Sequence, residues 1–200
     1  MNLVQRAINI ITQPRPEWRQ IAGEPGDAGR LMIGYALPLA LLPLIGSILG
    51  ALIFAGPLGF TFALLAALLS LAIGLGVLFL MGIIAGALAP GFDGRNVNNA
   101  ALKLVVYSST PVWIAGLIGG LIPFVGFLIV LVAFGYAAYL LYLGSMAVLN
   151  VPQTKAAGYT AVVIIIWFVI QAVISGIIIG AVTMALIGGA MATGGAYMYR

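Results

Sequence analysis

Three long stretches of this chain, residues 31–92, 104–154 and 156–199, contain no Asp, Glu, Lys or Arg. About 18 consecutive apolar residues already suggest one membrane-spanning helix, so these stretches together have room for several. Soluble domains carry about 25% charged residues because water must wet their surface, whereas this chain has 6%. The chain is therefore predicted to be an integral membrane protein whose solvent is lipid.

Proline, glycine and polar residues divide the apolar stretches into five predicted helices. We expect an all-α, polytopic membrane bundle of about five transmembrane helices over residues 31–200, preceded by a short amphipathic segment within residues 1–30. The predicted spans are 31–54, 60–88, 104–122, 127–149 and 159–186.

The basic residues predict the orientation of this bundle. Counted along the five-span model, one side of the membrane receives seven basic residues and the other only Arg200. Segments rich in Lys and Arg stay in the cytoplasm, so the N-terminus is predicted to be cytoplasmic and the C-terminus outside. The seven basic residues are Arg6, Arg15, Arg19, Arg30, Arg95, Lys103 and Lys155.

The residue types present exclude several kinds of chemistry. The chain has no Cys and no His, which removes disulfides, thiol nucleophiles and Cys/His metal sites. Its basic residues are spread over separate loops, which is not the clustered pattern of nucleic-acid binders. All four acidic residues lie in predicted loops, where we expect surface pairing with neighbouring arginines. We therefore predict no enzyme activity, no cofactor and no nucleic-acid partner.

Residues 1–13 form a predicted amphipathic helix too short to cross a membrane. Arg6 lies on its predicted polar side, so Arg6→Gln is expected to have little effect. Trp18, between Arg15 and Arg19, is predicted to anchor at the membrane interface. We expect the lipid bilayer to be the partner of this segment; the alternative is that the helix packs against the end of the bundle. Its predicted apolar face contains Leu3, Val4, Ala7, Ile8 and Ile11.

A polar cluster, Ser108, Ser109 and Thr110, precedes Pro111 in the third predicted span. Proline removes a helical hydrogen bond, and Ser or Thr hydroxyls can satisfy the freed backbone. The cluster is thus either a self-satisfied kink or a binding site for a polar ligand. Gln171 in the fifth predicted span has the same two interpretations, an interhelical hydrogen bond or a ligand contact.

Four Gly-x-x-x-Gly pairs indicate close packing between helices, because small residues let helix backbones approach each other. We interpret them as contacts within the bundle, and only weakly as a sign of self-association. The pairs are Gly46/Gly50, Gly82/Gly86, Gly116/Gly120 and Gly176/Gly180.

Four short motifs occur along the chain: Pro14, Trp18, Ile21 and Glu24 at their spacing, YSSTPVW at 107–113, YLLYLG at 139–144 and KAAGYT at 155–160. Together they resemble bacterial members of the Yip family, relatives of eukaryotic membrane proteins that interact with Ypt/Rab GTPases. The resemblance implies five spans, a cytoplasmic N-terminus and a bacterial inner-membrane location, and it brings no catalytic residues. The acidic-Leu-Tyr-Gly-Pro motif of the eukaryotic members is missing, so Rab-type GTPase binding is not expected.

Two functional hypotheses follow from these features. The first is a non-enzymatic membrane scaffold of the Yip type that organises lipids or partner proteins, including a membrane-protein partner or a second copy of itself. The second is a passive channel or small-solute carrier that uses the kinked third span.

Overall fold

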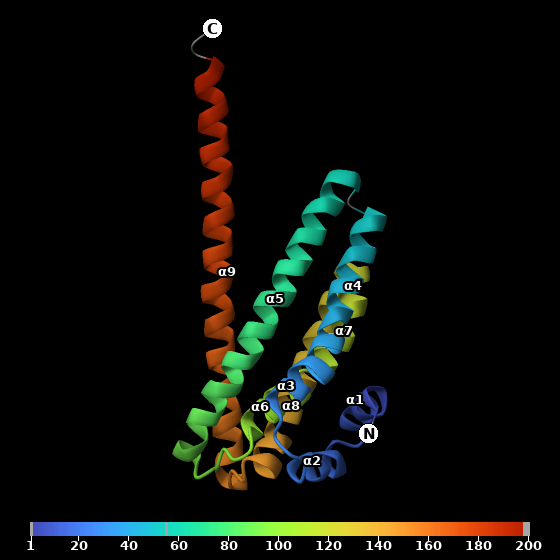
Figure 1. The fold of residues 1–200 in the computed structure, drawn as a ribbon, viewed down its shortest axis with the longest axis vertical. Helices are drawn as coiled ribbons and strands as arrows, with labels where there is room; N and C mark the ends of the chain where they lie inside the picture. Colours follow the sequence, from blue (N-terminus) through green and yellow to red (C-terminus); the bar gives the residue numbers. More distant parts are fainter. Residues whose placement is uncertain (1, 55, 198–200) are drawn as a thin grey trace. The chain divides into compact units, whose positions relative to one another are not determined.

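The computed structural model describes the backbone of residues 2–54 and 56–197, and the side chains of these residues except 57–59, 62, 123–124 and 178–197. Every regular element in this described part is a helix (Figure 1). In chain order they are α1 Leu3–Thr12, α2 Pro14–Ala22, α3 Ala28–Leu31, the π-helical turn η1 Met32–Ala36, α4 Leu37–Phe54, α5 Gly56–Leu88, the 3-10 turn η2 Ala89–Phe92, α6 Ala100–Ser108, α7 Thr110–Leu121, α8 Pro123–Val148 and α9 Gln153–Tyr197.

Five helical segments of the described chain are long and apolar enough to cross a membrane, which confirms the predicted all-α polytopic bundle. The bounds of the first four differ from the predicted ones by at most four residues, whereas the fifth begins six residues earlier than predicted. Lys103, predicted to lie in a loop, is inside α6 because the third segment begins at Ala100. The five segments are Ala28–Phe54, Ala63–Phe92, Ala100–Leu121, Val125–Val148 and Gln153–Ile177.

The chain divides into two compact units, residues 1–163 and 164–200. The second unit contains the later part of α9, including Gln171, whose side chain is half-buried. The candidate functional site lies entirely within the first unit.

The third spanning segment is broken at Ser109, between α6 and α7. Pro111 stands in the first turn of α7, where its missing N–H costs no helical hydrogen bond. The Ser109 hydroxyl donates to the Val105 carbonyl at 2.9 Å. The break is therefore a kink whose freed backbone is partly satisfied by the chain itself.

Helices α4 and α7 pack with their backbones almost in contact (Figure 1). A Cβ atom at Gly46 would collide with the backbone of Leu117, and one at Gly120 with the backbone of Ser47. A Cβ at Gly116 would lie 2.7 Å from Pro43 Cγ. Three of the four predicted glycine pairs thus lie at close contacts within the chain. Gly46/Gly50 and Gly116/Gly120 lie between α4 and α7, and Gly82/Gly86 lies against Leu102 and Asn96.

Candidate functional site

Helices α1 and α2, which we call the N-terminal cap (residues 3–22), fold against one end of the bundle. Helix α2 packs on α8, and α1 contacts both α2 and α7. Gln13 alone separates the two cap helices, and Pro14 suits the first position of α2. The change of direction at this point brings residues of α1 and α2 that are distant in sequence into contact.

Helix α1 has three different surroundings around its circumference. Successive residues turn by about 100°, and the sector that faces the bundle contains Arg6, Ala7 and Ile10, all buried. The next sector is apolar yet uncovered, with Val4 58% and Ile8 49% exposed. The opposite sector is polar. The predicted apolar face is therefore shared between the bundle and the outside of the molecule.

Arg6 is the centre of a buried charge network. Its guanidinium donates to Glu17 Oε1 at 2.6 Å and also to Glu24 Oε1. The Arg6 and Glu17 side chains are only 8% and 5% exposed. The guanidinium also lies 5.6 Å from the centre of the Tyr107 ring, a cation–π distance. Burial opposes the charged form of Arg6, but the hydrogen bond and charge of Glu24, helped by Glu17, outweigh it and raise its pKa.

This network corrects the predicted pairing of the acidic residues. Glu17 and Glu24 were expected to meet neighbouring arginines on the surface, and Arg6 was expected to lie on the polar side of α1. Instead one buried arginine takes both carboxylates, because the fold-back at Pro14 brings residues 6 and 17 together. Ile10 lies one turn after Arg6, is fully buried, and marks the sector that faces the bundle.

Lys103 of α6 fastens the end of α2 to the bundle. Its ammonium group donates to the carbonyl oxygens of Ile21 at 3.1 Å and Glu24 at 2.8 Å. The last carbonyls of a helix lack partners within the helix, and a cation placed there satisfies them. Lys103 is itself 4% exposed, so the cap and α6 form one packed unit.

Trp18 lies in the interior, 1% exposed, and not at an exposed interface. Its ring meets Tyr107 edge-to-face with centroids 6.3 Å apart. Gly144 leaves the room for it, since a Cβ there would be 2.7 Å from Trp18 Cζ2. The structure thus differs from the expected membrane anchor: the aromatic contact and the glycine opening draw the ring into the bundle.

The predicted polar cluster lies just inside the bundle from this cap. Thr110 Oγ1 and Tyr35 Oη share a hydrogen bond of 2.9 Å, and the Tyr35 and Tyr107 rings are 4.6 Å apart. Ser109 bonds to its own helix. The buried Ser108 hydroxyl has no hydrogen-bond partner among the described residues. Gln171 belongs to the other unit.

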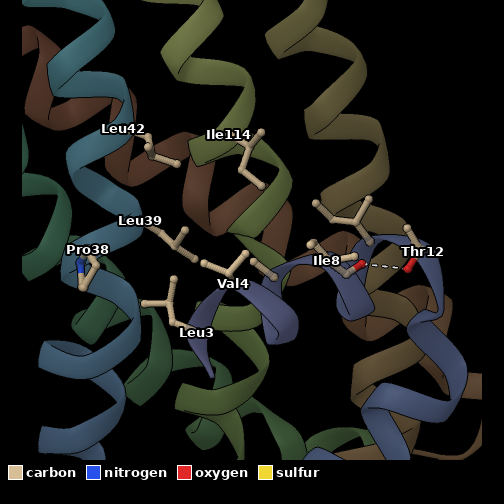
Figure 2. Close-up of a pocket in the computed structure, with 10 residues that line it drawn as sticks. Leu3, Val4, Ile8, Thr12, Pro38, Leu39, Leu42 and Ile114 are labelled. Carbon is tan, nitrogen blue, oxygen red and sulfur yellow. Dashed lines mark hydrogen bonds between the residues drawn. The ribbon is translucent and has the colours of Figure 1, made fainter. Parts of the chain in front are cut away.

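An apolar groove of about 420 Å³ runs between α1, α4 and α7 (Figure 2). All five residues of the predicted apolar face of α1 line it. Its one hydroxyl, Thr12 Oγ1, donates to the Ile8 carbonyl at 2.9 Å (Figure 2). The lining residues of this apolar groove are Leu3, Val4, Ala7, Ile8, Ile11, Thr12, Pro38, Leu39, Leu42 and Ile114.

Within the described residues, no three His, Cys, Asp or Glu side chains gather as metal ligands would. The five long apolar segments and the docked cap define a polytopic α-helical membrane protein. The family model of the Yip1 domain matches residues 8–175, which is most of the chain. The protein therefore belongs to the Yip1 domain family, as its motifs predicted. Comparison with curated proteins and with solved structures gave no match.

Proposed function

We propose that this protein is a non-enzymatic scaffold that organises lipids or partner proteins at the cytoplasmic face of a bacterial inner membrane. The N-terminal cap is the contact surface in this proposal. Seven basic residues on the cap side against one on the other support a cytoplasmic cap.

The single observation that carries the proposal is that the cap is fixed to the bundle while part of its apolar surface stays uncovered. Arg6 and Lys103 tie it through buried polar contacts. Val4 and Ile8 remain exposed beside the apolar groove. A scaffold needs such a surface, because a pre-ordered contact region loses little conformational entropy on binding.

The polar groups near the cap are used in packing. Arg6, Glu17 and Lys103 are each bonded to the protein and buried. Thr110 bonds to Tyr35, and Ser109 to its own helix. These bonds support a structural role for the third-segment cluster over the channel hypothesis.

Photocrosslinking in native membranes tests the scaffold proposal. A benzophenone amino acid would replace Val4 or the exposed Arg19 of the cap, with Val132, 75% exposed on α8, as the matched control. We expect discrete adducts, identified by mass spectrometry, from the cap positions and not from position 132. Equal adduct patterns at all three positions, together with solute leakage from proteoliposomes, would instead favour a channel.

A further inference from the structure

We propose that the apolar groove binds one acyl chain of an anionic phospholipid from the leaflet that surrounds the cap. This inference rests on the proposed function and names the lipid site within it. Its starting observation is that an apolar groove opens beside the exposed Val4 and Ile8 side chains.

The depth of the groove suits an acyl chain. Leu39 lies 11 residues after Ala28, where its spanning segment begins, which is about 16 Å along a helix at 1.5 Å per residue. Ile114 lies 14 residues after Ala100, or about 21 Å by the same rise. The hydrocarbon core of a bilayer is about 30 Å thick. Leu39 and Ile114 therefore lie inside their spanning segments and not at the segment ends, which is where acyl chains surround a membrane helix.

The polar sector of α1 is also adapted to a lipid surrounding. Asn2 Oδ1 accepts from the Val4 N–H at 2.7 Å, Gln5 donates to Asn9 Oδ1 at 2.8 Å, and Thr12 donates to the Ile8 carbonyl. Polar groups near hydrocarbon are costly unless they are bonded within the protein. These local hydrogen bonds lower the cost of placing α1 against lipid.

Charge complementarity favours an anionic headgroup. Two buried cations face Glu17 and Glu24: Arg6 pairs with both, and the Lys103 ammonium lies near Glu24. The exposed charges of residues 13–30 are then three basic and one acidic, namely Arg15, Arg19 and Arg30 against Asp27. Arg15 follows Thr12 of the groove by three residues, so their Cα atoms are at most about 11 Å apart. A phosphate attached to a chain in the groove is then within the field of this basic surface.

Photolabelling of the full-length protein in nanodiscs tests the site. The probe is phosphatidylglycerol with a diazirine in one acyl chain, compared with a phosphatidylcholine probe of the same chain. We expect label on residues 3–12 and 37–43. Val4→Trp with Leu42→Phe should fill the groove and lose most of this label. Val132→Trp with Leu128→Phe, at exposed positions of α8, should keep it.

The headgroup is tested by Arg15→Gln with Arg19→Gln, which should reduce the preference for phosphatidylglycerol over phosphatidylcholine. Val4→Trp alone changes an exposed residue and serves as a second variant if the double change misfolds. Label spread evenly over the spanning segments, label that survives groove filling, or capture of a second copy through Val4 would each overturn the site. An unchanged headgroup preference would overturn its anionic part. Cap adducts in native membranes can persist in any of these cases, so the scaffold proposal is tested separately.

Discussion

Arg6 of α1 donates a hydrogen bond to Glu17 of α2 over 2.6 Å, and both side chains are less than a tenth exposed. Eleven residues separate them along the chain. Their pairing joins the two cap helices, while Tyr107 of α6 beneath the guanidinium joins both to the bundle. A segment of this composition could lie on a membrane surface without contacting the bundle. The contacts of Arg6 with Glu17 and Tyr107 instead make the cap part of the fold.

Replacing Arg6 with Leu should destabilise the docked cap by about 3–5 kcal/mol, because it leaves buried carboxylates without their partner. Thermal unfolding in detergent and limited proteolysis after Gln13 measure the loss. Arg19→Gln, at an exposed position of the cap, is the matched control and should change little. Restored stability in Arg6→Leu with Glu17→Leu would confirm the pairing, whereas a harmless Arg6→Leu would refute it.

The close approach of α4 and α7 predicts opposite effects for two Gly→Ala changes. At Gly46 an added methyl collides with the Leu117 backbone, so Gly46→Ala should cost about 1–3 kcal/mol through overpacking. At Gly74 of α5 nothing described lies within 4 Å, so Gly74→Ala should be neutral or gain up to about 1 kcal/mol of helix propensity. Equal melting temperatures for the two variants would contradict this packing.

The hydrogen bond between Thr110 and Tyr35 predicts a modest structural effect. Thr110→Val should lower stability by about 1 kcal/mol, a usual value for a polar contact between membrane helices. Tyr35→Phe should act on the same contact, so the double variant should cost less than the sum of the single changes. Thermal unfolding of the four proteins gives this coupling, and strictly additive effects would show that the two hydroxyls do not interact.

The orientation can be tested with single cysteines, since the chain has none of its own. Cysteines at Asn98 and Gln153 should react with an impermeant maleimide only after the membrane is permeabilised. Cysteines at Ile122 or Phe54, at the other ends of their helices, should react from outside. Labelling of the cysteine at position 153 in intact cells would contradict the proposed topology.

The spanning segments could be predicted because a membrane helix requires about twenty apolar residues in succession, a pattern that single substitutions do not hide. The uncharged stretch 31–92 is long enough for two such helices. The cap could not be predicted in detail, because its contacts depend on single partners. A helical projection places Arg6 on the polar side of its helix. Its contact with Glu17 depends on the change of chain direction at Pro14, which the projection does not contain. Trp18 between two arginines is typical of an interface, and its burial depends on the space at Gly144, 126 residues away.

The most direct test of a docked cap is a distance measurement between spin labels at Gln5 of α1 and Leu52 of α4 in nanodiscs. Both positions are exposed. Gln5 lies near the start of α1, and Leu52 lies near the end of α4. We predict one narrow distance distribution in the native protein and a broad one in Arg6→Leu. A broad distribution in the native protein, unchanged by Arg6→Leu, would contradict the docked cap.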